Sequence, residues 1–442
     1  MKSLIRSWLN QFFTLKPNPF IHPQIRASFR RNFFANAADV STWMFGDSFV
    51  SVYTILPVFA STLTSSSIVI GLIPAIKNAG WYLPQLFLAP KVERSPRQLP
   101  AVLLLGAIER LPYLALAFAA LWLPSLPQNT AILIFLLIMI WISVTSGLVA
   151  LPWQELIARL IPVSHRGRFW GFATMMGSLM GVIGAAIAGI ILARVVYSLN
   201  YALCFLIGFL SFSLSFAFIT LNREPDLSST ISPPSRKRSS WGRIKTAMRE
   251  NKNFRNFITS RGMAYLGNMA FGFVAVYSIQ RFNLPDASVA IFTAILIGGG
   301  AVGFALWGFA GDRLGYKRVL TYTGLCWVFG LVLLLIAPSV VWVFPAYALM
   351  SIANSGNFIG DINIIMEFSS ISERPTYIGL ARTLTGPVLL IAPILAGAIV
   401  QIRSYQTMFA VSIFFSVIGL ILLGILVVEP RQHADTRLDN GK

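Results

Sequence analysis

Cysteine, histidine and charged residues are all scarce in this chain of 442 residues. Its two cysteines, Cys204 and Cys326, lie in apolar runs of different halves, which argues against a disulfide framework. The three histidines, His22, His165 and His433, lie outside the long apolar runs. No Cys/His cluster could bind a transition metal, and no glycine-rich loop followed by Lys and Ser or Thr could hold ATP phosphates. We therefore expect no metal, no cofactor and no enzymatic activity.

Charged residues make up 12% of the chain, about half their usual share in soluble domains, while 56% of the residues are hydrophobic. A soluble fold could not bury so much apolar surface, whereas a lipid bilayer can solvate it. The net charge of +19 would by itself be compatible with nucleic-acid binding. The basic residues, however, lie at the ends of the apolar runs, so we expect a membrane protein with no nucleic-acid partner.

Twelve apolar runs are long enough, at about 20 residues, to cross a bilayer as helices. The longest interruption, residues 222–255, contains the basic run Arg236-Lys237-Arg238 and separates six runs from six. The sequence therefore predicts an all-α membrane protein with twelve transmembrane helices in two six-helix bundles. The predicted spans are approximately 37–60, 66–90, 99–123, 129–151, 168–193, 200–221, 256–280, 287–309, 318–337, 341–366, 375–401 and 406–428.

The distribution of basic residues predicts the orientation in the membrane. Of the 35 Lys and Arg, 28 fall in one alternating set of segments, three in the other set (Arg194, Arg281 and Arg403), and four within spans. The positive-inside rule then places both termini in the cytoplasm, where the basic segments face anionic lipids. We expect a monomer in a bacterial inner membrane. The predicted parts are a cytoplasmic N-terminal segment (1–36), a first bundle (37–221), a basic linker (222–255), a second bundle (256–428) and a cytoplasmic tail (429–442).

Near the N-terminus, Ile5, Trp8, Leu9 and Phe12 recur at helical spacing between basic residues. This pattern predicts an amphipathic helix on the inner membrane surface within residues 1–16. A partly ordered tail is the alternative.

Two short patterns occur in both halves, in the same order, which indicates a duplicated six-helix unit. After the second span comes Glu93-Arg94, and after the eighth comes Asp312-Arg313. Arg166-Gly-Arg168 precedes the fifth span, and Arg374 precedes the eleventh. The segment after the eighth span has Gly308, Asp312-Arg313, Gly315 and Lys317-Arg318.

This last segment resembles the loop signature of the major facilitator superfamily at each of its positions. The resemblance implies a twelve-helix fold of two pseudo-symmetric bundles, secondary transport, and a loop that acts as a cytoplasmic latch. Gly308 is expected to allow close helix approach. The first-half copy departs from the signature, because Glu93 stands where the family has Asp and Pro96 where it has the second Gly.

Four ionisable residues of the first half fall at similar depths: Asp47, Lys77, Glu109 and Arg110. Such groups cost about 2.5–3.5 kcal/mol each on insertion scales, so they are functional candidates. An acid whose partner moves between two states can carry a proton, whereas a static ion pair only fixes helix register. We expect proton coupling from this group, with Asp47 as the coupling acid. Lys77 is the expected partner of Asp47 or Glu109; the adjacent Glu109 and Arg110 should point about 100° apart and have different partners.

Polar residues also share helix faces in the second half. Asn354, Asn357 and Asp361 lie at i, i+3 and i+7 in the tenth span, and Arg261, Tyr265 and Asn268 at i, i+4 and i+7 in the seventh. Since spans 1, 4, 7 and 10 line the central cavity in the resembled family, these stripes would face substrate, with interhelical hydrogen bonding as the alternative. The predicted gate is Arg261, Asp361 and Arg382. The predicted cavity residues are Trp43, Trp81, Tyr265, Asn268, Asn354 and Asn357.

These patterns predict a secondary active transporter that moves a small organic solute by alternating access, with proton coupling. A carrier fold kept as a membrane sensor or scaffold is the alternative. The irregular first-half loop favours that alternative, whereas the charged groups near the middle of the membrane argue against it.

Overall fold

The structure is a computed structural model that describes residues 23–225, 249, 251–368 and 374–429. The amphipathic helix predicted within residues 1–16 lies outside these ranges, as does most of the predicted linker. The described residues form helices joined by short turns, with no strand among them. The chain is an all-α, multi-pass membrane protein.

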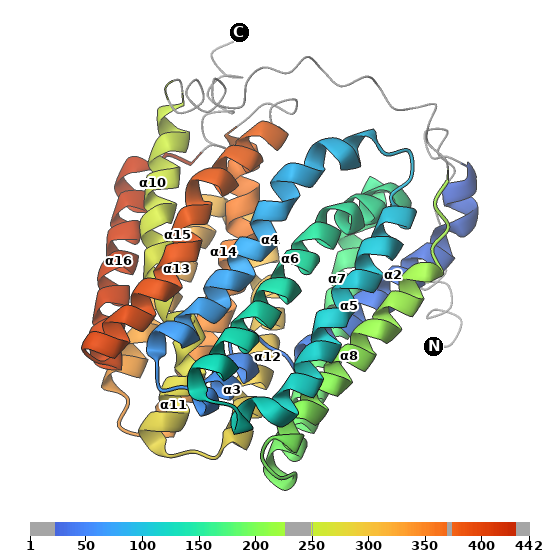
Figure 1. The fold of residues 1–442 in the computed structure, drawn as a ribbon. Helices are drawn as coiled ribbons and strands as arrows, with labels where there is room; N and C mark the ends of the chain where they lie inside the picture. The colour runs from blue at the N-terminus through green and yellow to red at the C-terminus, as the bar shows by residue number, and fades with distance from the viewer. Residues whose placement is uncertain (1–22, 226–248, 250, 369–373, 430–442) are drawn as a thin grey trace, which may run out of the picture. The chain divides into compact units, whose positions relative to one another are not determined.

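Helices occupy each of the twelve predicted spans (Figure 1). Those of the first half are α2 (Pro23–Asp47), α3 (Ile55–Leu63), α4 (Ser67–Arg94), α5 (Leu99–Trp122), α6 (Gln128–Leu160), α7 (Val163–Arg194) and α8 (Leu199–Thr220). Those of the second half are α10 (Lys252–Gly267), α11 (Val274–Phe282), α12 (Val289–Leu314), α13 (Tyr316–Ile336), α14 (Val343–Glu367), α15 (Arg374–Ile402) and α16 (Tyr405–Leu426). Among the described residues, nine helical segments are long and apolar enough to cross a membrane.

The first span is not the single helix 37–60 that the sequence predicts. It starts at Pro23 and is interrupted between Asp47 and Ile55, so that α2 and α3 together make the span. Pro57 has no N–H to donate to residue 53, and a continuous helix would need that bond. The first turns of α2 contain many polar residues. Phe29 and Phe33 in these turns are nevertheless buried against Ile157 and Phe169, and this packing makes the turns part of the bundle.

Asparagine side chains stabilise this early start of α2. Asn36 donates to Asn222 Oδ1 at 2.6 Å, and the Oδ1 of Asn32 accepts the backbone N–H of Arg223 at 2.9 Å. Both asparagines are fully buried. A hydropathy pattern treats asparagine as a break, whereas here its hydrogen bonds attach the start of α2 to the end of α8.

The seventh span is interrupted at the matching place in the second half. Between α10 and α11 lies a 3₁₀ segment, Asn268–Phe273. The Gly267 carbonyl accepts bonds from the Trp327 indole N–H, at 3.1 Å, and from the Ser412 hydroxyl. Backbone that leaves the α-helix inside a membrane needs such partners from neighbouring helices. Both halves thus contain a broken first helix.

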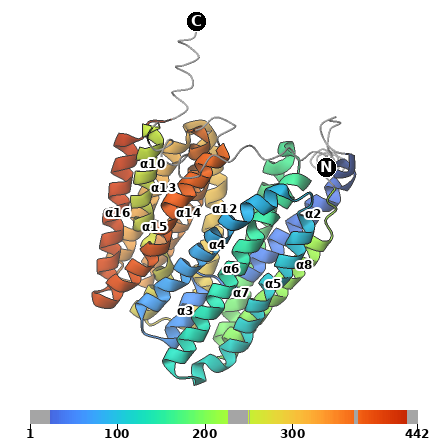
Figure 2. The same ribbon diagram turned by 45° about the horizontal axis from the view of Figure 1, so that its top comes forward.

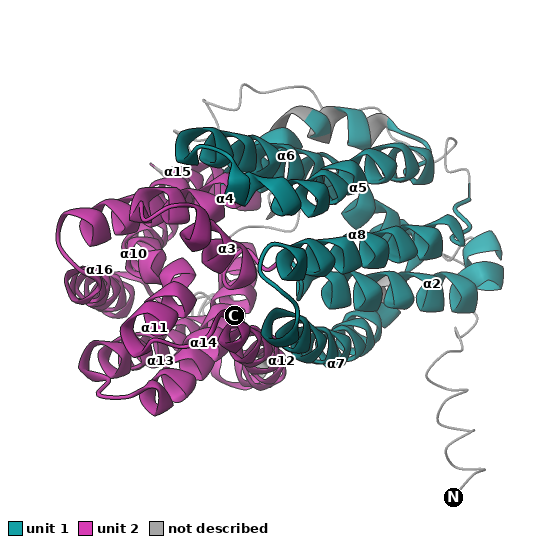
Figure 3. Ribbon diagram, turned by 60° about the horizontal axis from the view of Figure 1, so that its bottom comes forward, with its two compact units in different colours: residues 1–50, 79–235 teal, residues 51–78, 236–442 magenta. Residues whose placement is uncertain are grey.

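The helices divide into two compact units (Figure 3). Unit 1 contains residues 1–50 and 79–235, where α2 packs on α7 and α8, and α5 packs on α6 and α8. Unit 2 contains residues 51–78 and 236–442, where α10 packs on α16, and α14 on α12 and α13 (Figure 2). The division falls inside the first span, at the break, and inside α4.

Residues 51–78, which we call the α3–α4 hairpin, pack on the second-half helices of unit 2. The hydroxyls of Thr54 and Thr293 are 2.7 Å apart, and the Asn78 amide donates to the Leu389 carbonyl at 3.2 Å. Gly71 has no room for a side chain, because a Cβ there would lie 2.2 Å from the Pro393 carbonyl oxygen. The hairpin therefore approaches α15 at backbone distance.

Candidate functional site

Asp39 is a buried acid of unit 1 that the sequence analysis did not select. It lies on α2 with only 3% of its surface exposed. The Ser215 hydroxyl on α8 donates to its Oδ1 at 2.5 Å, and the Trp153 indole N–H on α6 donates to its Oδ2 at 2.9 Å. Its bonds to described residues come from neutral groups, and no described cation lies within ion-pair distance. The signal for it was available, since Asp39 is an acid inside the first predicted span.

Glu109 and Arg110 pair with each other, contrary to the expectation that adjacent residues would have different partners. The Arg110 guanidinium lies 2.7 Å from Glu109 Oε2, and both side chains are almost fully buried. Arg110 also donates to the carbonyls of Gly106, at 2.8 Å, and Phe212, at 3.2 Å. The Cα–Cβ bonds diverge along the helix, but these long side chains reach across that divergence.

Aromatic rings enclose the Arg110 guanidinium. Its central carbon lies 5.3 Å from the ring centroids of both Trp43 and Phe216. Trp43 in turn lies 4.2 Å from the Phe212 ring. A cation held between aromatic faces in a dry site is stabilised by about 2 kcal/mol or more. In unit 1, then, Trp43 packs against Arg110, and its predicted role in a substrate cavity remains a prediction.

The remaining first-half candidates are Asp47, Lys77 and Trp81. Asp47 is the last residue of α2, at the break, and is exposed. Lys77 is half-buried and belongs to the hairpin part of α4 in unit 2, so its pairing with Asp47 or Glu109 remains a prediction. Trp81, one turn later on α4, is half-buried.

In unit 2, the predicted gate residues Arg261 and Asp361 form a two-pronged ion pair. Arg261 Nε lies 2.7 Å from Asp361 Oδ1, and Nη2 donates to Oδ2 at 2.9 Å. The Tyr265 hydroxyl donates to the same Oδ2 at 2.5 Å, while the Tyr265 ring lies 4.9 Å from the guanidinium carbon. The pair joins α10 to α14. Such fork-to-fork geometry combines strength with a fixed orientation.

Asn357 extends this network to a third helix. Its Oδ1 accepts from Arg261 Nη2 and from the Thr323 hydroxyl of α13, both at 3.2 Å. Of the predicted stripe on the tenth span, Asn357 and Asp361 thus meet Arg261, whereas Asn354 is exposed. Arg382 is exposed on α15, and the bonds that the structure shows to Asp361 come from Arg261 and Tyr265.

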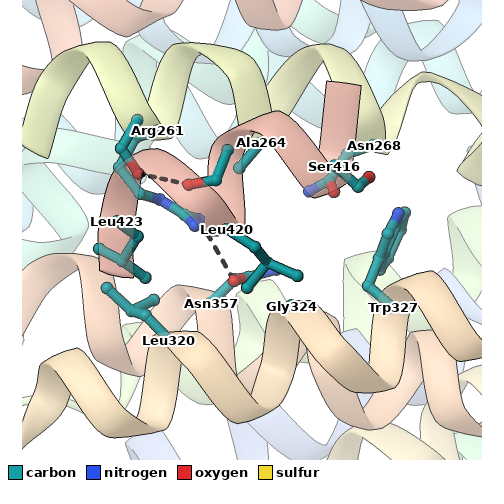
Figure 4. A pocket seen from close by; sticks show the side chains of 12 residues that line it. Arg261, Ala264, Asn268, Leu320, Gly324, Trp327, Asn357, Ser416, Leu420 and Leu423 are labelled. Atoms are coloured by element: carbon teal, nitrogen blue, oxygen red, sulfur yellow. Dashed lines mark hydrogen bonds between the residues drawn. The ribbon is translucent and has the colours of Figure 1, made fainter. Parts of the chain in front are cut away.

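A small cavity adjoins the network (Figure 4). Its volume is about 20 Å³, and Arg261, Asn268, Trp327 and Asn357 are among the residues that line it. Ser416 also lines it and is 5% exposed. A cavity of this size has room for about one water molecule and none for an organic solute. Arg261 and Asn268 of the predicted stripe therefore face the interior of unit 2 at this point.

The signature loop is a one-residue turn between α12 and α13. Gly315 forms it with φ +85°, a conformation that residues with a Cβ rarely adopt. Arg313 and Arg318 are exposed. The expectation for Gly308 is wrong, since no described atom lies within 4 Å of a Cβ built there; the close glycine is Gly311, whose Cβ would lie 2.4 Å from the Tyr316 ring. The side chains of Glu93, Arg94 and Asp312 lie outside what the structure describes.

Glu224, four residues beyond the end of α8, is a second residue that the sequence analysis missed. Its carboxylate accepts the backbone N–H groups of Gln98, at 2.8 Å, and Leu99, at 2.7 Å, and so caps the start of α5. Arg159 of α6 lies 3.8 Å from it and donates to the carbonyls of Ser95 and Pro96. This carboxylate therefore fixes the turn between the second and third spans.

One family model matches the second half of the chain. The family model described as Major Facilitator Superfamily matches residues 257–441, which hold the signature loop and the Arg261–Asp361 pair. The second half of the chain is thus similar to the major facilitator superfamily. This is a superfamily of multi-pass membrane transporters, and the match covers the second bundle.

Solved structures share the major facilitator fold over nearly the whole chain. The nucleoside transporter NupG has a TM-score of 0.66 at 15% identity, covering 89% of this chain and 99% of its own. A D-xylose-proton symporter has a TM-score of 0.70 at 12% identity (90% and 98% covered). A POT family transporter in complex with 5-aminolevulinic acid has a TM-score of 0.66 at 15% identity (95% and 99% covered). No curated protein matches the sequence. At these identities the similarity shows the fold and leaves the substrate open.

Proposed function

We propose that this protein is a proton-coupled carrier of the major facilitator type for a small organic solute, acting as a monomer by alternating access. It would lie in a bacterial inner membrane with both termini in the cytoplasm, as the distribution of Lys and Arg indicates. The single observation that carries the proton coupling is the burial of Asp39 between neutral donors.

A buried carboxyl group without a cation beside it is favoured in its protonated, neutral form. Its charged form becomes favourable only when water or a cation reaches it. Ser215 and Trp153 hold Asp39 from two other helices, α8 and α6. A rearrangement of these helices that admits water would let Asp39 lose its proton. Arg110, a buried cation of the same unit, already pairs with Glu109. Protonation of Asp39 is thereby linked to helix packing, which is the requirement for coupling.

Alternating access fits the way the chain is divided. The chain passes from one unit to the other at the break in the first span and again within α4. Any movement of one unit against the other must therefore bend the chain at these two places. The break between Asp47 and Ile55 lacks a continuous helical ladder and offers a hinge. Asp47 is exposed beside that hinge, and it remains the second candidate for the coupling acid.

The Arg261–Asp361 pair is the proposed gate of unit 2. It joins α10 to α14 through two largely buried side chains of opposite charge. Breaking it would free α14 to move against α10, with Arg382 as a second cation for Asp361. Lys77, Trp43, Trp81, Asn268 and Asn354 would complete the coupling and substrate sites.

The first experiment is a search for the substrate with purified full-length protein. Thermal unfolding is followed at two pH values against nucleosides, pentoses, amino acids and peptides, classes that include those named for the similar structures. A ligand at a hundred times its Kd adds about 2.7 kcal/mol to stability. Stabilisation by one chemical class supports the carrier. A folded protein that neither responds to any class nor moves a solute in proteoliposomes supports the sensor or scaffold instead.

The second experiment assigns the coupling acid. Asp39→Asn keeps one acceptor oxygen for the Trp153 indole, and its amide can donate to the Ser215 hydroxyl, so we expect a folded protein that exchanges substrate across the membrane but no longer accumulates it against a proton gradient. Asp47→Asn is the matched comparison on the same helix. Loss of accumulation in Asp47→Asn alone would move the assignment to Asp47. Normal accumulation in both variants would end the proposal of coupling by either acid.

A further inference from the structure

A basic groove opens in unit 2 where the start of α13 meets the end of α16. Its volume is about 550 Å³. Arg313, Lys317 and Arg318 line one wall, and Gly424, Ile425, Val427, Val428 and the acid Glu429 line the other. We propose that this groove binds one anionic phospholipid, with the phosphate against the three cations and an acyl chain along the apolar rim. The proposal goes beyond transport and does not depend on the coupling mechanism.

The three cations suit a phosphate group. Arginine presents a planar fork that matches phosphate oxygens, and a lysine adds a point charge. The Arg313 guanidinium lies 4.1 Å from the Phe309 ring, which restricts its position, and Lys317 Nζ donates to the Gly424 carbonyl at 3.0 Å. Arg318 is exposed. Two of the cations are therefore already held in place at the mouth of the groove.

The rim of the groove is apolar and exposed. Ile425 is 76% exposed, Val428 45% and Leu314 42%. Apolar groups of this size beside three cations would be unfavourable in water, but they match the boundary between lipid headgroups and acyl chains. A soluble anion would satisfy the cations and leave this rim uncovered. Charge and apolar surface together favour a phospholipid over a free phosphate.

The first half of the chain shows that helix capping does not require these cations. In the alignment that matches Pro96 with Gly315, Lys317 and Arg318 correspond to Gln98 and Leu99 at the start of α5. Glu224 caps α5 without a basic residue at either place.

Glu429 stands in the matching position in the second half. It follows α16 as Glu224 follows α8, and both precede a proline. Its carboxylate oxygen lies 2.8 Å from where a Gly315 Cβ would be, beside the start of α13. Since a carboxylate in this position caps a helix in the first half, the cations Lys317 and Arg318 are an addition specific to the second half.

The test uses the full chain in an uncharged detergent. Native mass spectrometry measures binding of dioleoyl phosphatidylglycerol and, for comparison, dioleoyl phosphatidylcholine. We expect phosphatidylglycerol to bind at least about tenfold more tightly, since each basic residue near an anionic headgroup favours it. The variant R313Q/K317Q/R318Q should lose this preference. The control R194Q/R281Q/R403Q removes the same charge from exposed arginines and should keep it.

Two further measurements keep the proposal falsifiable. The variant R313K/R318K retains the charge and should retain most of the preference, which separates lost charge from misfolding. Inorganic phosphate at constant ionic strength should not displace the lipid. Displacement by inorganic phosphate, equal binding of the two lipids, or an equal loss in the control variant would each overturn the proposal.

Discussion

Replacing Arg261 with glutamine removes the cation from the interhelical ion pair of unit 2. Asp361 would then keep one donor, the Tyr265 hydroxyl. Removing one partner of a buried pair costs about 3–5 kcal/mol, because the other charge stays buried. The Asp361 side chain is 13% exposed, so water can reach it in part. We therefore expect a loss of about 3 kcal/mol in the free energy of unfolding, at the lower end of this range.

The double variant R261Q/D361N tests the reasoning behind that magnitude. It removes both charges and leaves two amides that can bond to each other, to Asn357 and to Tyr265. The loss in the double variant should therefore be smaller than the sum of the two single losses by about 2 kcal/mol, within the range seen for residues in contact. It should also be smaller than the loss in either single variant.

The assay is unfolding in mixed micelles with increasing dodecyl sulfate, followed by far-ultraviolet circular dichroism. Arg281→Gln, which removes an exposed arginine from the end of α11, is the control and should change stability by less than about 0.5 kcal/mol. Losses in R261Q and D361N that simply add in the double variant would refute a coupled buried pair. A neutral R261Q would refute the burial argument itself.

Further predictions follow from other close contacts in the structure. Gly71→Val should lower stability by about 1–3 kcal/mol, because its Cβ would lie 2.2 Å from the Pro393 carbonyl oxygen. Gly298→Ala should be tolerated, because no described atom lies within 4 Å of a Cβ there. Thermal unfolding of both variants checks this. Glu224→Gln should cost about 1 kcal/mol by weakening the cap of α5, whereas Glu155→Gln, at a 41% exposed side chain, should cost little; a larger loss in Glu155→Gln would contradict the capping role. Trp153→Phe removes the indole donor to Asp39, so the pH dependence of transport should shift; an unchanged pH profile would count against Asp39 as the coupling acid.

The sequence determined the membrane character of the chain and the approximate positions of its spans. A run of about 20 apolar residues has few alternatives to a transmembrane helix, because only a helix satisfies its own backbone in lipid. The signature loop was also readable, since the left-handed turn at Gly315 requires a residue without a Cβ. Both properties are local, and neither depends on distant parts of the chain.

The start of α2 is a part of the fold that local sequence patterns did not predict. Asn32 and Asn36 lower the hydropathy of these turns, so the sequence placed them outside the membrane bundle. They are buried because residues 222 and 223, which lie almost two hundred positions later, supply their hydrogen bonds. No pattern within the segment contains that information.

Only the tertiary structure decided which charged groups are buried together. Asp39 and Asp47 lie in the same predicted span, but Trp153 and Ser215 come from α6 and α8 to enclose Asp39, while Asp47 is left exposed at the helix break. Glu109 and Arg110 likewise diverge along their own helix and still pair, because neighbouring helices close around the guanidinium. Helical spacing determines the direction of each Cα–Cβ bond. The partners that the end of a side chain contacts depend on helices that are close in space and distant in sequence.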